Sequence, residues 1–153
     1  MKGYNSTDDT LEHIHLVNLQ LTKVVQELIM KKRFHDESKL ESPEKEIFDI
    51  VTPKLKNMTY GSQEYKKSLE EMGEALDHHY LFNRHHPEHF PQGIEGMNLM
   101  DLLEMVCDWK SATMRHADGD IQKSLVINKE RFGISDQLIQ IISNTVDYLE
   151  TGE

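Results

Sequence analysis

Five of the nine histidines of this chain of 153 residues lie between residues 78 and 89. Histidine nitrogens and carboxylate oxygens are common protein ligands of divalent transition metals, and a tract rich in histidine is typical of metal binding. Without a metal such a tract is costly, because neighbouring imidazolium groups repel each other. The adjacent residues His35 and Asp36 add a nitrogen and an oxygen ligand elsewhere in the chain. The sequence therefore predicts a divalent metal centre.

Helical phase divides the histidine-rich segment into two groups. His79 and His86 are seven residues apart, which is two helical turns, so both can face the interior of a helical bundle. His78 and His85 are expected to point elsewhere, and the role of His89 stays open. The alternative is a solvated polar helix end without a metal.

Two histidines near the N-terminus compete for a place in the site. His13 shares a helix face with Val17 and Val24, whereas His15 lies on nearly the opposite side. We therefore expect His13 to be the ligand, with His15 as the alternative. An ordinary histidine at the boundary of an amphipathic helix remains the competing interpretation.

Asp108 is a carboxylate inside an apolar stretch. Its neighbours are Val106, Cys107 and Trp109, and Asp101 lies two turns earlier on the same face. A carboxylate buried among such residues is costly unless it is paired or coordinates a metal. Asp108 is therefore a candidate ligand, and its alternative is an aspartate at the edge of an amphipathic helix.

The elements that must position these residues are helices. Pro43 suits the start of a short helix that Pro53 is predicted to close, and Gly133 suits a C-terminal cap. No alternating strand pattern is present, which predicts an all-α, single-domain bundle of five to seven helices over residues 1–153. Apolar residues at helical spacing predict helices over residues 10–33, 44–51, 62–85, 98–116, 121–132 and 136–149.

Composition narrows the class of partner and the compartment. The net charge of −10 argues against long nucleic acids and anionic membranes as partners. No apolar run approaches the roughly 18 residues of a membrane-spanning helix, and the acidic start MKGYNSTDDTLEH is not typical of a targeting peptide. The single Cys107, expected to be buried, cannot form an internal disulfide. We therefore expect a cytoplasmic protein.

Four segments occur in an order that resembles the HD-domain superfamily of metal-dependent phosphohydrolases: EHIHLV, RFHDESK, DHHYLFNRHHPEH and LLEMVCDWKSA. In this superfamily a helical histidine precedes a His-Asp doublet, and a final aspartate follows. The doublet followed by Ser38 and Lys39 is similar to the usual doublet of the family. The tract HHYLFNRHHPEHFPQGIEG is loosely similar to the histidine-pair and glycine-proline segment of the two-metal branch.

The resemblance implies hydrolysis of a small phosphate ester, such as a nucleotide, by metal-activated water. It implies one or two divalent ions, with Mn, Fe, Co, Zn, Ni and Mg not distinguished. It also implies that Asp36 and Lys39 are catalytic. The implied residues are His13, His35, Asp36 and Asp108 for the first metal, His79 and His86 for the second, and Lys39, Arg84, Arg115 and Arg131 for the substrate.

Over nearly its whole length, the chain more closely resembles a family of short phage and bacterial proteins of uncharacterised function. The shared phrases are similar to HHYxxNRHHPEHF, DLLEMxCDWK and RFGISDQL. That family implies no activity. The alternative to an enzyme is therefore a non-catalytic HD-like module that binds metal, a phosphorylated ligand or a protein partner. A helical bundle without metal is the third possibility, and a homo-oligomer is compatible with each.

Overall fold

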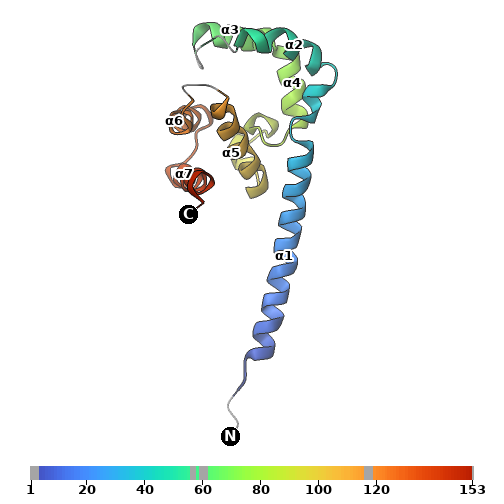
Figure 1. The fold of residues 1–153 in the computed structure, drawn as a ribbon, viewed down its shortest axis with the longest axis vertical. Helices are drawn as coiled ribbons and strands as arrows, with labels where there is room; N and C mark the ends of the chain where they lie inside the picture. Colours follow the sequence, from blue (N-terminus) through green and yellow to red (C-terminus); the bar gives the residue numbers. More distant parts are fainter. Residues whose placement is uncertain (1–3, 56–57, 59–61, 116–118, 153) are drawn as a thin grey trace. The chain divides into compact units, whose positions relative to one another are not determined.

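The computed structural model describes residues 4–55, 58, 62–115 and 119–152. These residues form α-helices and short 3-10 helices and no strand (Figure 1), which confirms the prediction of an all-α fold. None of the helices in the described ranges is long and apolar enough to cross a membrane. The chain divides into two compact units, Met1–Phe34 and His35–Glu153, and each is described by itself. The single domain over residues 1–153 stays a prediction.

The first unit contains one uninterrupted helix, α1, over Thr7–Phe34 (Figure 1). Its first turn carries Asp8 and Asp9, and its last turn carries the basic residues 31–33. Both sets oppose the helix dipole and therefore stabilise the helix ends. The predicted helix over residues 10–33 is thus present and begins three residues earlier. No residue of α1 is buried.

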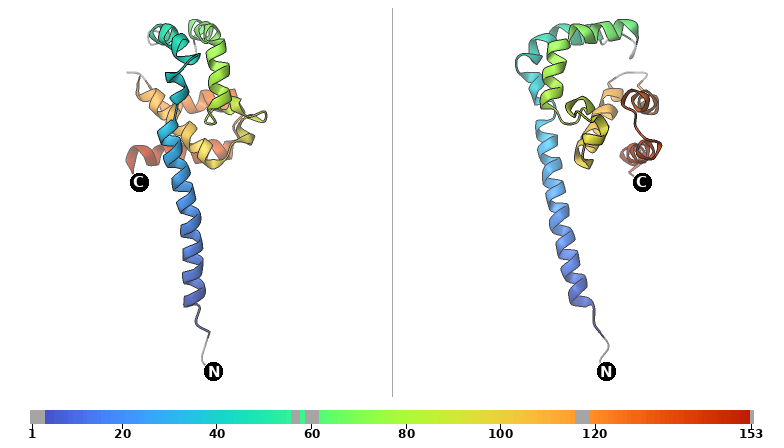
Figure 2. Two further views of the ribbon diagram at one scale, coloured as in Figure 1. Left: turned by 90° about the vertical axis from the view of Figure 1, so that its right-hand side faces the viewer. Right: turned by 180° about the vertical axis from the view of Figure 1, so that it is seen from behind.

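The second unit holds the remaining elements (Figure 2). Asn98 and Asp101 form a capping box at the start of α5, which satisfies backbone N–H groups that the helix leaves unpaired. Asp120 and Ser135 cap α6 and α7 in a similar way, and Gly133 ends α6 in the left-handed conformation. The elements are η1 (Glu37–Leu40), α2 (Glu44–Leu55), α3 (Gln63–Glu71), α4 (Gly73–Phe82), η2 (Pro87–His89), η3 (Gly93–Gly96), α5 (Leu99–Met114), α6 (Ile121–Phe132) and α7 (Asp136–Thr151).

The predictions for two helices, over residues 44–51 and 62–85, are wrong in their boundaries. Helix α2 continues past Val51 and includes Pro53 in its last turn, where a proline removes only one helical hydrogen bond. The predicted helix over residues 62–85 is two helices, because the chain breaks at Met72 and α4 ends at Phe82. The predicted end of α5 at residue 116 lies outside the described residues.

The apolar core of the second unit joins α5, α6 and α7. Its centre includes Met105 from α5, Leu125 from α6 and Val146 from α7, each at most 3% exposed. On the other side of α5, Glu104 and Asp108 lie near His35 in the turn before η1, and Glu104 also lies near His85 in the segment after α4. Cys107 is exposed rather than buried, because it lies outside this core.

Candidate metal centre

The predicted doublet forms the turn between α1 and η1. Asp36 adopts a left-handed backbone conformation with φ of 58°, which aspartate tolerates better than most residues. Its neighbour His35 places Nδ1 3.0 Å from Glu104 Oε1 on α5. The other ring nitrogen, Nε2, lies 3.7 Å from Asp36 Oδ2 and 3.7 Å from Asp108 Oδ1. The turn therefore brings both side chains of the doublet to α5.

The residues His35, Asp36 and Asp108 form the first group of possible ligands. Each offers one donor atom, and the three atoms lie within 4.8 Å of one another. Ligand atoms around a tetrahedral ion with bonds of about 2.0–2.2 Å lie about 3.3–3.6 Å apart. The two distances from His35 Nε2, 3.7 Å to each carboxylate, are close to this range. These three side chains are therefore spaced so that a divalent ion could be held among them.

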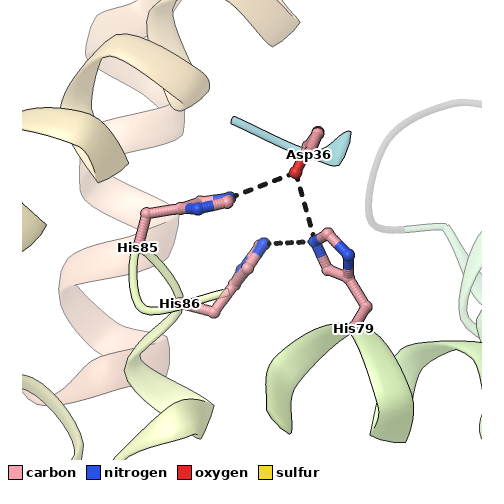
Figure 3. Close-up of side chains that lie close together, drawn as sticks. All are labelled: Asp36, His79, His85 and His86. Carbon is pink, nitrogen blue, oxygen red and sulfur yellow. Dashed lines mark hydrogen bonds and ion pairs between the residues drawn. The ribbon is translucent and has the colours of Figure 1, made fainter. Parts of the chain in front are cut away.

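A second group contains Asp36, His79, His85 and His86 (Figure 3). Oδ1 of Asp36 lies 3.3 Å from Nε2 of His79 and 3.4 Å from Nε2 of His85. Nε2 of His79 is in turn 2.9 Å from Nε2 of His86. Asp36 belongs to both groups, because its Oδ2 faces the first group and its Oδ1 faces the second.

Two buried atoms at this point, Asp36 Oδ1 and His85 Nε2, face each other at 3.4 Å without a well-formed hydrogen bond. Buried polar atoms in folded proteins are nearly always well satisfied, so a pair held only by this long contact is compatible with a bound ion between them. Both atoms are metal ligands in chemical type, and both belong to the second group. The side chains present therefore fit a divalent metal.

Carboxylates behind the histidines orient the rings. Glu44 is fully buried, and its two oxygens accept hydrogen bonds from Nδ1 of His78 at 2.7 Å and Nδ1 of His79 at 2.8 Å. Glu104 lies 3.0 Å from Nδ1 of His35 and 3.4 Å from Nδ1 of His85. In a neutral imidazole whose Nδ1 donates to a carboxylate, the lone pair is on Nε2, which is the usual arrangement behind a metal-binding histidine.

The charge state of His86 suits coordination. Burial, and then positive charge on His85 and His79, lowers the pKa of the His86 imidazole to about 3. The ring is therefore neutral at physiological pH and keeps a lone pair for a metal.

His35 has the opposite electrostatic environment. The carboxylate of Asp108, and then that of Glu104, raises the pKa of His35 to about 10. Burial raises the pKa of the Asp36 carboxyl, but interactions with His85 and Lys39 outweigh it and hold that pKa below its ordinary value. Without a metal the ring of His35 is therefore a positively charged imidazolium that lies among carboxylates. A divalent cation bound here would supply the positive charge in its place.

Of the four basic residues predicted to bind substrate, one lies at the candidate metal centre. Lys39 Nζ is 2.6 Å from Asp36 Oδ2. Arg84 instead makes two hydrogen bonds to the buried Asp101, and Arg131 pairs with Glu88. Arg115 is exposed at the end of α5. Contact with substrate stays a prediction for all four.

The structure brings together five of the six predicted ligands: His35, Asp36, His79, His86 and Asp108. His13, like His15, is exposed on α1 in the first unit. The groups of possible ligands found among the described residues do not include it. That any of these residues binds a metal stays a prediction.

The sequence-based prediction of the metal centre did not include three residues that the structure places there: Glu44, His85 and Glu104. His85 was expected to point away, but α4 ends at Phe82, so helical phase no longer applies at residue 85. The ring is instead 1% exposed and faces Asp36. Glu104 precedes Asp108 by one helical turn, and this i, i+4 spacing was the available signal. Nothing in the local sequence marks Glu44.

The model of a family described as a family of unknown function (DUF5662) matches residues 2–148. The match confirms the resemblance to an uncharacterised family over nearly the whole chain. No curated protein matches the chain, and no solved structure matches it either. The relationship to the HD-domain superfamily stays a prediction.

Proposed function

Since this chain belongs to a family of unknown function, DUF5662, its activity has to be inferred from its own side chains, and we propose that it is a metal-dependent phosphohydrolase. The proposed substrate is a nucleotide or another small phosphate ester. One observation carries the proposal: the Asp36 carboxylate is shared by two groups of possible metal ligands. A carboxylate between two ions is suited to a two-metal centre, in which ions about 3.5–4 Å apart act on one phosphoryl group.

The mixed nitrogen and oxygen donors fit a divalent transition metal or Mg²⁺, and no thiolate is among them. Bound here, such an ion would bring the pKa of a coordinated water toward neutrality and offset negative charge on phosphoryl oxygens. The chain itself would supply Asp36 and Asp108 to balance the charge of the cations. Glu44 and Glu104 would hold the imidazoles in the orientation described above.

Exposure differs between the two groups. The side chains of His35, Asp36 and Asp108 are 31%, 23% and 28% exposed, whereas those of His79 and His85 are 2% and 1% exposed. Water and substrate would therefore enter from the side of the first group. Three protein ligands with an accessible side match the pattern of catalytic sites, which keep a position for water, better than the closed set of a structural site.

Lys39 is the cation placed to meet the substrate. Its ammonium group pairs with Asp36 and lies 5.5 Å from the centre of the Phe48 ring. It stands beside the accessible group and is itself 34% exposed. An ammonium group there would attract a phosphoryl oxygen and stabilise the charge that develops during the displacement. Because a charged ammonium group has no lone pair, Lys39 would not hold the metal.

Phosphate release tests the proposal. The chain, purified without a histidine tag, would be loaded with Mn²⁺, Co²⁺, Mg²⁺ or Zn²⁺ and incubated with a panel of nucleotides and small phosphate esters. Asp36→Ala should abolish release. Lys39→Ala should reduce release while metal content stays unchanged, because Lys39 is not a ligand.

Lys45→Ala is the matched control. Lys45 makes an ion pair of the same length, 2.6 Å to Asp49, at a site outside the ligand groups, so its loss should leave phosphate release unchanged. A metal-loaded wild type that releases no phosphate from any member of the panel would contradict the proposal. The non-catalytic binding module would then be the better account.

A further inference from the structure

Helix α1 carries an apolar stripe that its own unit cannot cover. The unit consists of this one helix, and none of its residues is buried. Leu11, Ile14, Leu21 and Val25 on the stripe are 49–58% exposed. An isolated amphipathic helix is only marginally stable in water, and most helical stability in proteins comes from packing of the apolar face. The stripe therefore requires a partner.

The spacing of the stripe is that of a coiled coil. Its residues alternate at intervals of three and four, as in heptads whose first and fourth positions are called a and d. Lys32 occupies the next a position and ends the apolar run. The a positions are Leu11, Asn18 and Val25, and the d positions are Ile14, Leu21 and Leu28.

The polar residue of the stripe points to a second copy of the chain as the partner. A single asparagine at an a position, here Asn18, specifies the register and oligomer state of a coiled coil of identical helices. Val25 at a with Leu21 and Leu28 at d favours two parallel strands, whereas Leu11 at a with Ile14 at d is a combination that favours more strands. We propose that α1 forms a parallel, in-register coiled coil with α1 of a second copy, which makes the protein a homodimer.

Asn18 decides the orientation of the two helices. In a parallel pair it faces Asn18 of the second copy, and an amide can both donate and accept a hydrogen bond, so each satisfies the other. In an antiparallel pair, layers mix a with d positions, and the amide would face Leu21 without a partner. The parallel pair also brings the two acidic first turns together, so that their carboxylates repel each other. These charges are exposed, and physiological salt screens their repulsion. An unsatisfied buried amide in the antiparallel pair would cost more free energy than this repulsion.

The apolar stripe is shorter than the helix. It runs from Leu11 to Leu28, about two and a half heptads, and four positions of each heptad contact the partner, which gives about 10 contacting residues on each side. Standard protein interfaces use about 20–30 residues on each side. The proposed interface is therefore about half the standard size, and we expect a dimer that dissociates on dilution.

Sedimentation analysis of the full chain tests the dimer. Wild type at micromolar concentration should have a mass of 35.8 kDa, twice the 17.9 kDa of one chain. Leu21→Glu, at a central d position, should shift the mass to 17.9 kDa. The matched control is Leu19→Glu, because Leu19 is equally apolar and 46% exposed but lies outside the a and d positions; it should stay dimeric. Circular dichroism would show that both variants keep the helices of the second unit.

Disulfide trapping tests the orientation. In a Cys107→Ser background, Thr7→Cys at a d position should form a covalent dimer on oxidation, whereas Gln20→Cys on the outer face should not. A wild type of 17.9 kDa would overturn the proposal, and so would dissociation by Leu19→Glu as complete as that by Leu21→Glu. A dimer in which Thr7→Cys does not cross-link would refute the parallel arrangement.

Discussion

A chelator should lower the melting temperature of the metal-loaded protein. The possible ligands come from four places in the chain: the turn at His35 and Asp36, helix α4 with His79, the segment after α4 with His86, and helix α5 with Asp108. An ion that joins these segments can do so only when the chain is folded. Its binding free energy therefore adds to the free energy of unfolding.

The size of the effect follows from linkage. With free metal at 100 times the dissociation constant, binding to the folded state alone adds about 2.7 kcal/mol. For a chain of this size, 1 kcal/mol shifts the melting temperature by roughly 3 °C. Removal of one ion should therefore lower the melting temperature by about 8 °C, and loss of a second ion would add to this decrease.

Thermal unfolding followed by circular dichroism, before and after addition of EDTA, measures the shift. Asp36→Ala provides the control, because it removes the ligand shared by both groups. This variant should melt at the same temperature with and without EDTA. If wild type shown to contain metal melts at an unchanged temperature after EDTA strips the metal, the ion does not bridge these segments, and the proposed centre is wrong.

Two further predictions concern the ligands and the residues behind them. Metal binding at pH 8 should release at least one proton. The pKa of His35 is about 10 without metal, so its ring is an imidazolium at pH 8 and must lose a proton before it can coordinate. Calorimetric titrations in two buffers of different ionisation enthalpy measure this release, and equal heats of binding in the two buffers would contradict it. Glu44→Gln should weaken metal binding by about 10–100-fold, because Glu44 orients His79. Glu46→Gln is the control, because Glu46 is an exposed neighbour on the same helix, and it should leave metal binding unchanged. Equilibrium dialysis compares the two variants, and equal affinities would show that Glu44 does not support the metal centre.

The sequence predicts the helices well where their ends carry local signals. The helix at 121–132 has the predicted bounds, because Asp120 caps its start and Gly133 ends it in a left-handed conformation. The end of α4 carries no comparable signal. Asn83 leaves the helix with extended backbone angles, two residues before the histidine pair. The prediction for His85 therefore failed where helical periodicity stopped.

Part of the candidate site is predictable from the sequence, because some of its residues stand out by their type and by their order in the chain. The doublet His35 and Asp36 and the aspartate Asp108 are recognisable from residue type and order. Glu44 is not, because it reaches His79 from 35 residues away in the sequence. Which remote segment supplies the supporting carboxylate depends on how the helices pack, and neither spacing nor composition specifies that.

Anomalous diffraction from crystals grown with Mn²⁺ tests the metal centre most directly. We predict two peaks about 3.5–4 Å apart, one on each side of the Asp36 carboxylate. One peak should contact His35 and Asp108, and the other should contact His79 and His85, in keeping with the two groups of ligand atoms. The proposed metal centre would be contradicted by peaks that do not contact Asp36. It would also be contradicted by the absence of any peak in crystals of protein shown to contain manganese at full occupancy.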